Sequence, residues 1–121
     1  MTIRQGKILI VDDNEDILFT LKMLLRPRVE NITTCSDPKE INRLVSRNQY
    51  DVILLDMMLP DMDGFTLCQK IREHHLFPIL MLTAKVDETD KITGLTLGAD
   101  DYITKPFNPD SLILQVRNMI S

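Results

Sequence analysis

Short runs of apolar residues recur along the chain and alternate with longer segments whose apolar residues are spaced three or four apart. Three of the runs are continuous and rich in Ile, Val and Leu. Such runs are too short for helices and too apolar for half-exposed strands, so they predict strands buried on both faces of a parallel sheet. Two weaker runs contain β-branched or aromatic residues and also predict strands. The five expected strands cover residues 7–11, 32–35, 52–55, 79–82 and 102–104.

The segments between these strands have the periodicity of helices with one apolar face. The clearest example has apolar residues at Ile17, Leu18, Leu21, Leu24 and Leu25. Asp37 precedes Pro38, and Asn108 precedes Pro109. Each pair places a capping side chain before a proline at the first helical position, which is a helix start signal. We expect five helices, beginning near Asn14, Asp37, Gly64, Asp87 and Asn108.

Strands and helices therefore alternate along the whole chain. This alternation predicts the α/β class, with a doubly wound five-stranded parallel sheet in a three-layer (βα)5 sandwich. Right-handed crossovers leave few strand orders, and we expect the flavodoxin-like order 2-1-3-4-5. The connections are short, without a linker or a repeat, so residues 1–121 are expected to form one domain.

Composition narrows the function classes. The formal net charge is -4 and no run of Lys and Arg is present, which disfavours direct nucleic-acid binding by this domain. No stretch approaches the ~18 apolar residues of a membrane span, so no membrane association is expected. Cys35 and Cys68 lie far apart and have neither zinc-site nor disulfide spacing. A reducing cytoplasm is the expected location.

Polar side chains that could take part in a reaction follow four of the five expected strands. Asp12 and Asp13 follow the first strand, Asp56 the third, Thr83 the fourth and Lys105 the fifth. In open parallel sheets, ligands bind beyond the carboxyl ends of the strands. Each residue alone would be read as a helix cap or a loop residue. Together they predict a site at one edge of the sheet.

The three carboxylates would repel one another unless a cation lay among them. Oxygen ligands at an open edge suit Mg²⁺, whereas zinc and softer metals prefer His or Cys. A carboxylate beside Mg²⁺, an ammonium and a hydroxyl can attack phosphorus and form an aspartyl phosphate. Asp56 is the expected nucleophile, because it is a single carboxylate on the central strand. Asp12 and Asp13 are paired, as metal ligands would be.

These residues belong to segments that resemble receiver domains of two-component response regulators, in particular those joined to winged-helix transcriptional regulators. The resemblance covers essentially the whole chain, and its motifs are specific in combination. The segments are residues 11–13 (VDD), 55–56 (LD), 58–64 (MLPDMDG), 82–85 (LTAK) and 98–107 (GADDYITKPF).

The resemblance implies that Asp56 receives a phosphoryl group from a histidine kinase or a phosphotransfer protein. It implies Mg²⁺ binding by Asp13, Asp56 and the backbone carbonyl of Met58, with Asp12 acting through a water. Such a domain catalyses its own phosphorylation and dephosphorylation and is not a turnover enzyme on a small substrate. Its output would be the control of transcription.

The resemblance also assigns a switch. Thr83 and Lys105 would hold the phosphoryl oxygens, and Tyr102 would change rotamer when Thr83 moves towards the phosphate. The signal would then reach the face formed by the fourth helix, the fifth strand and the fifth helix.

Relatives of this type dimerise through charged pairs on that face. Lys91, Asp100 and Asp101 stand at matching positions, and Asp100 and Asp101 would otherwise be read as solvated loop residues. Ser111 and Gln115 occupy positions where those relatives carry an acid and a base. A monomer is expected, with at most a weak phosphorylation-dependent homodimer.

A runner-up is an Asp-nucleophile phosphohydrolase of the haloacid dehalogenase type. That class needs a second Asp two positions after the nucleophile, where this chain has Met58. A nucleotide-binding or flavin-binding protein of the same fold would need a Gly-rich phosphate loop, and the four glycines form none. Whether the chain acts alone or is part of a longer regulator stays open at this point.

Overall fold

The computed structural model describes residues 3–56, 64–75, 77–83, 99–105 and 107–120. These residues form a five-stranded parallel sheet with the order β2-β1-β3-β4-β5, which confirms the predicted fold class and strand order. The strands are β1 (Ile3–Val11), β2 (Val29–Cys35), β3 (Val52–Asp56), β4 (Ile79–Thr83) and β5 (Asp101–Thr104).

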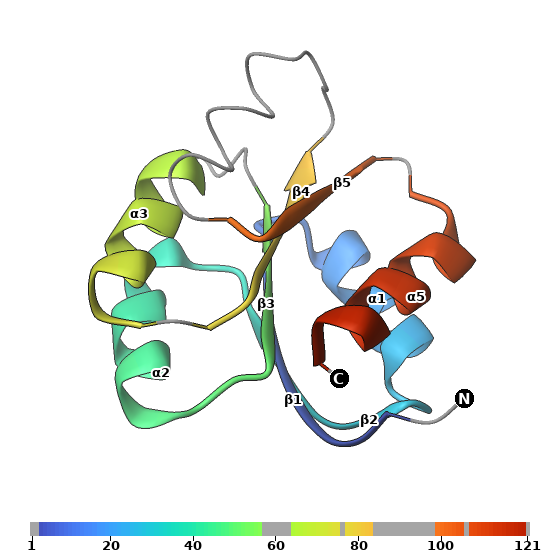
Figure 1. Cartoon of the computed structure of the whole chain (residues 1–121). Helices are drawn as coiled ribbons and strands as arrows, with labels where there is room; N and C mark the ends of the chain where they lie inside the picture. The colour runs from blue at the N-terminus through green and yellow to red at the C-terminus, as the bar shows by residue number, and fades with distance from the viewer. Residues whose placement is uncertain (1–2, 57–63, 76, 84–98, 106, 121) are drawn as a thin grey trace.

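Helices cover both faces of the sheet, so the fold has three layers (Figure 1). Helices α2 and α3 lie on one face, and α1 and α5 lie on the other. The helix expected to begin near Asp87 lies outside the described residues. The described helices are α1 (Glu15–Leu25), the short 3-10 turn η1 (Pro38–Glu40), α2 (Ile41–Arg47), α3 (Gly64–His74) and α5 (Pro109–Ile120).

Two of the predicted helix starts are confirmed by their caps. The Asn14 side chain accepts hydrogen bonds from the backbone N–H groups of Asp16 and Ile17, at 2.9 and 3.3 Å. The Asn108 side chain does the same for the second and third residues of α5. These caps satisfy donors that have no partner within the helix.

The helix predicted to start at Asp37 begins there as a 3-10 turn and not as an α-helix. The Asp37 side chain accepts from Lys39 N at 3.0 Å, and its carbonyl accepts from Glu40 N at 3.1 Å. These bonds form the 3-10 turn η1, so the regular helix α2 begins only at Ile41. A 3-10 turn is common at the N-terminus of a helix.

Two strands begin earlier in the chain than the sequence predicted. Strand β1 begins at Ile3 rather than at residue 7, and its pairing with β2 shifts register between Ile3 and Lys7. Strand β2 begins at Val29 rather than at residue 32. The missed part of β2 includes exposed Glu30 and Asn31, because β2 is an edge strand whose polar side chains reach solvent.

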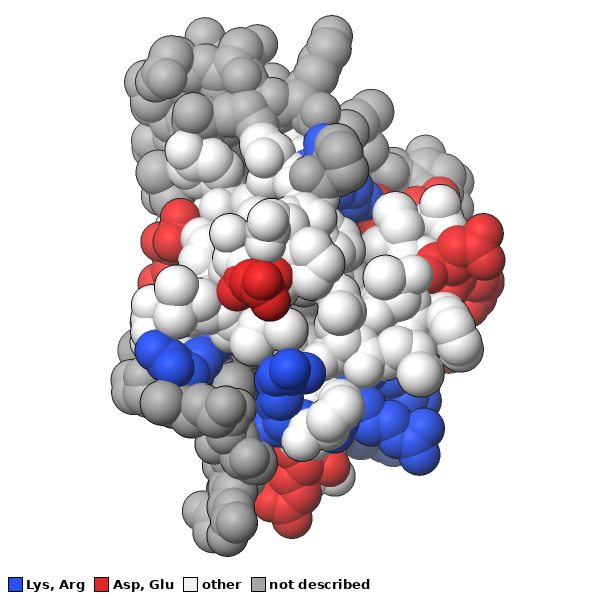
Figure 2. All heavy atoms as spheres, turned by 90° about the vertical axis from the view of Figure 1, so that its right-hand side faces the viewer, with Lys and Arg blue, Asp and Glu red and all other residues white. Residues whose placement is uncertain are grey.

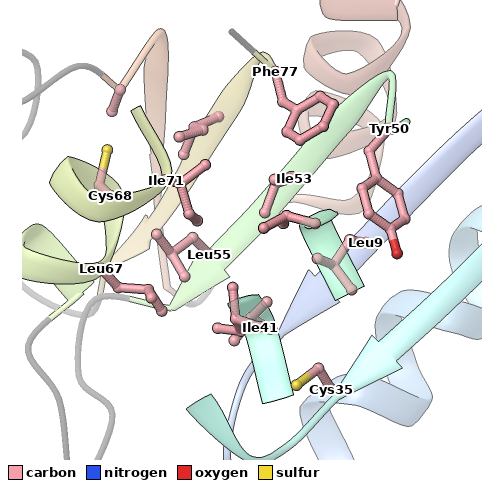
Figure 3. Close-up of a cluster of buried hydrophobic side chains, with 14 of the residues drawn as sticks. Leu9, Cys35, Ile41, Tyr50, Ile53, Leu55, Leu67, Cys68, Ile71 and Phe77 are labelled. Atoms are coloured by element: carbon pink, nitrogen blue, oxygen red, sulfur yellow. The ribbon is translucent and has the colours of Figure 1, made fainter. Parts of the chain in front are cut away.

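Two apolar clusters form the core, one on each face of the sheet. Strand β3 is buried along its whole length and contributes to both, because successive side chains point to opposite faces. Ile53 and Leu55 point towards α2 and α3 and form one cluster with Ile71 of α3, as Figure 3 shows. Val52 and Leu54 belong to the cluster on the other face. The carboxyl end of β3 is thus held from both sides.

The face formed by α1 and α5 carries mostly uncharged side chains, with several Lys and Arg side chains towards its lower edge (Figure 2). Large apolar side chains are exposed on both helices, at Phe19, Met23 and Leu114. Among the described residues, no helix is both long enough and apolar enough to cross a bilayer.

Candidate functional site

The predicted site residues come together at the carboxyl edge of the sheet. Asp12 and Asp13 directly follow β1, and Lys105 directly follows β5. Asp56 and Thr83 are the last residues of β3 and β4. Strands β1, β3, β4 and β5 are consecutive neighbours in the sheet, so their carboxyl ends lie side by side at one edge.

Lys105 joins two of the carboxylates. Its Nζ lies 3.0 Å from Asp12 Oδ2 and 3.2 Å from Asp56 Oδ1. Asp12 is 0% exposed and Asp56 is 4% exposed. Two buried carboxylates therefore share one ammonium, and each charge in the group is partly compensated within low-dielectric surroundings.

Both carboxylate oxygens of Asp12 accept hydrogen bonds. Oδ2 accepts from Lys105, and Oδ1 accepts from the backbone N–H of Asn14 at 2.9 Å. Burial raises the pKa of Asp12 above its usual value, although both of these bonds act in the opposite direction. The negative charge of Asp56 raises the pKa of Asp12 further. The ionised form of Asp12 therefore gains from any additional cation nearby.

Asp13 completes an acidic group with Asp12 and Asp56. The ligand oxygens of these three residues lie within 4.8 Å of one another. Asp13 is exposed, whereas the other two are buried, so the group opens to solvent on the Asp13 side. Three carboxylates against the single Lys105 ammonium leave an excess of negative charge among these four side chains. This oxygen-only donor set fits Mg²⁺.

The structure does not place every expected ligand and partner. Met58, the expected carbonyl ligand, and Lys91, an expected interface residue, both lie outside the described residues.

Thr83 and Tyr102 lie on the adjacent strands β4 and β5. Thr83 pairs with Thr104 in the sheet, and its carbonyl accepts from Lys105 N at 2.7 Å. Tyr102 is half-buried and packs against the apolar cluster beneath α2 and α3. The expected switch residues are therefore on adjacent strands, and the backbone of Lys105 is bonded directly to Thr83.

Asp100 has partners within its own chain. Its Oδ2 accepts from Ile79 N at 2.7 Å and from Arg72 Nη2 at 3.0 Å. Arg72 also donates to the carbonyl of His75 at 3.3 Å. This network ties the end of α3 to the starts of β4 and β5, at the sheet edge opposite the carboxylates.

Asp101 is also engaged within the chain. Its Oδ2 accepts from Gln115 Nε2 at 2.9 Å, and its Oδ1 accepts from Tyr102 N at 2.8 Å. The roles of Arg72 and Gln115 were missed by the sequence analysis. Their bonds join residues 28 and 14 positions apart, and no local pattern signals such pairs.

Comparisons with known proteins agree with this geometry. The family model for the response regulator receiver domain matches residues 8–117. The chain is 48% identical over 111 residues to the regulatory protein VanR of Enterococcus faecium, covering 92% of this chain and 48% of VanR. It is 46% identical over 115 residues to the transcriptional regulatory protein SrrA of Staphylococcus aureus, covering 95% of this chain and 48% of SrrA. The chain thus spans about half the length of these relatives.

A solved structure is similar over nearly the whole chain. The two-component response regulator from Clostridium difficile superposes with a TM-score of 0.91 at 34% sequence identity. The match covers 96% of each chain.

Proposed function

Because the chain belongs to the family of response regulator receiver domains, we propose that Asp56 is the residue that accepts its phosphoryl group. The chain is a receiver of two-component signalling and not a metabolic enzyme, and its family implies a histidine kinase as partner. Mass spectrometry of the protein incubated with acetyl phosphate and Mg²⁺ tests the acceptor assignment.

One observation carries this proposal. The Lys105 ammonium bonds to Asp56 and Asp12 at the carboxyl edge of the sheet, with a third carboxylate, Asp13, on the open side. A phosphoryl group on Asp56 would add negative charge beside Lys105, where a cationic donor is already in place. Thr83, at the end of the neighbouring strand β4, is the proposed hydroxyl donor to a second phosphoryl oxygen.

The reaction transfers a phosphoryl group from a histidine nitrogen to a carboxylate oxygen of Asp56. A carboxylate oxygen of Asp56 forms a bond to phosphorus while the bond from phosphorus to the donor nitrogen of a phosphohistidine breaks. The electron pair of that bond returns to the histidine nitrogen. Positioning and charge stabilisation supply the catalysis in such transfers, and Lys105 provides both at Asp56.

Asp13, Asp56 and the Met58 carbonyl are the proposed direct ligands of Mg²⁺. Asp12 already accepts a bond at each oxygen, which supports an indirect role through a water. When bound, Mg²⁺ would neutralise part of the charge on the phosphoryl oxygens.

Replacing Asp13 by Ala is expected to raise thermal stability in the absence of Mg²⁺ and to weaken Mg²⁺ binding. The substitution relieves repulsion with the two buried carboxylates and removes one metal ligand. A rise of roughly 2–4 °C in the unfolding midpoint in EDTA corresponds to a small gain in stability for a domain of this size. Calorimetry in EDTA and with a Mg²⁺ titration measures both effects.

Asp16→Ala is the matched control for this experiment. Asp16 is exposed in the first turn of α1, where its negative charge favours the helix. Its loss should lower stability slightly and leave Mg²⁺ affinity near the wild-type value. An Asp13→Ala protein that is less stable in EDTA and binds Mg²⁺ normally would show that Asp13 acts only in the turn before α1.

Phosphorylation is proposed to act on the output through Thr83 and Tyr102. Movement of the Thr83 hydroxyl towards the phosphoryl group would change the packing of Tyr102, which now lies against the α2 and α3 side of the core. VanR and SrrA are regulatory proteins about twice as long as this chain, which supports control of transcription as the output. The cytoplasm is the proposed location.

The unphosphorylated chain is expected to be a monomer, with at most a weak dimer after activation. Asp100 and Asp101 are already bonded to Arg72 and Gln115 within the chain, so pairing with a second copy through these acids would compete with existing bonds. Direct contact with nucleic acid is not proposed for this domain. Sedimentation at micromolar concentration, with and without beryllofluoride, measures the oligomeric state. A stable dimer of the unmodified protein would contradict this expectation.

A further inference from the structure

A closed set of hydrogen bonds caps the backbone of Tyr102 on β5. The Gln115 amide donates to the Tyr102 carbonyl at 3.2 Å and to Asp101 Oδ2 at 2.9 Å. The other oxygen of the Asp101 carboxylate accepts from Tyr102 N at 2.8 Å. Both backbone polar groups of Tyr102 therefore bond to one pair of side chains.

This pair lies on an edge strand. Strand β5 is last in the sheet order and has β4 as its single strand neighbour among the described residues. An edge strand exposes backbone groups that a further strand would otherwise bond. Asp101 and Gln115 supply the acceptor and the donor that such a strand would offer to Tyr102. They do so without adding a strand.

The capped residue is three positions before Lys105. On the β4 side, the backbone of Lys105 is held by its bond to the Thr83 carbonyl at 2.7 Å. On the α5 side, Gln115 ties the start of β5 to a helix anchored in the core by Leu112 and Val116, both 0% exposed. Hydrogen bonds thus hold the backbone at both Tyr102 and Lys105.

We propose that Gln115, together with Asp101, is a positioning residue for Lys105; this inference rests on the proposed function of the site. Lys105 has a long side chain with many rotamers, yet its Nζ must meet Asp12 Oδ2 and Asp56 Oδ1 together. A strand held on both edges fixes the point from which that side chain reaches. Gln115 touches neither reacting carboxylate and acts through the backbone of β5.

Replacing Gln115 by Leu tests this role, because Leu has similar bulk and no donor. We expect phosphoryl uptake from acetyl phosphate to slow by roughly threefold to tenfold, less than the ~10²-fold that a 1 Å misplacement at a reacting centre can cost. We expect Mg²⁺ affinity to rise roughly twofold to threefold, because a less well placed Lys105 offsets less of the carboxylate charge. General loosening of the fold would instead lower both.

Gln69→Leu is the matched control, since Gln69 is an exposed glutamine on α3, on the opposite face of the sheet. It should leave uptake and Mg²⁺ affinity unchanged. Gln115→Arg keeps donors that can reach both Asp101 and the Tyr102 carbonyl, so it should retain at least half of the wild-type uptake rate. Calorimetric midpoints of all variants establish that each is folded.

Two outcomes would overturn the positioning role. One is a folded Gln115→Leu protein with wild-type uptake and Mg²⁺ affinity, and the other is a fall in both quantities. If the wild-type protein takes up no phosphoryl group, the proposed function fails instead. The Mg²⁺ titration then still reports whether Gln115 holds Lys105 beside the carboxylates.

Discussion

Replacing Asp56 by Asn is expected to abolish phosphoryl uptake from acetyl phosphate. The wild-type protein should gain one phosphoryl group in the presence of Mg²⁺, and the variant should gain none. The amide of Asn has nearly the shape of the carboxylate but is a very weak nucleophile, so the fold survives while the acceptor is lost. Intact-protein mass spectrometry measures the added group directly.

Asp110→Asn is the matched control for Asp56→Asn. Asp110 is an exposed acid in the first turn of α5 and lies outside the acidic group. The control should take up phosphate at the wild-type rate, and EDTA should suppress uptake in both proteins. Undiminished uptake by Asp56→Asn, or equal uptake with EDTA and with Mg²⁺, would rule out Asp56 as the magnesium-dependent acceptor.

Replacing Lys105 by Met is expected to slow phosphoryl uptake by about 10²- to 10³-fold, the usual cost of removing one donor to a charge that develops in the transition state. Met keeps most of the apolar stem and removes the ammonium, which now lies 3.0 Å from Asp12 and 3.2 Å from Asp56. Rates of uptake followed by mass spectrometry give this change.

The same Lys105→Met substitution should tighten Mg²⁺ binding, by roughly threefold to tenfold. The positive charge of Lys105 competes with the metal for the same carboxylates, and its removal leaves their repulsion uncompensated. Calorimetric titration with Mg²⁺ measures the affinity. The opposite signs of the two effects separate the loss of a charge from a loss of fold.

Lys70→Met controls for the removal of a lysine elsewhere. Lys70 is exposed on α3 and does not belong to the acidic group. Neither uptake nor Mg²⁺ affinity should change in this variant. If Lys105→Met takes up phosphate at the wild-type rate, Lys105 serves only to compensate the buried charge of Asp12 and Asp56.

The position of the site could be read from the sequence because it depends on strand ends. Continuous apolar runs mark β3 and β4, and the first polar residue after each run is Asp56 or Thr83. Parallel strands place all their carboxyl ends at one edge, so residues distant in sequence could be assigned to one site. The first residues of β2 were not predicted as strand, because this part of an edge strand contains exposed polar residues and lacks a continuous apolar run.

The sequence by itself thus predicted the fold class, the strand order, two helix caps and the polar residues that lie at the carboxyl edge of the sheet. Hydrophobic periodicity and capping are local properties, and a few residues suffice to specify them. Only the tertiary structure decided which of these residues bond. The Lys105 ammonium meets Asp12 across 93 positions and Asp56 across 49, and Asp101 meets Gln115 across 14. Such pairs depend on how helices and strands pack, because each bond needs its donor and acceptor about 3 Å apart.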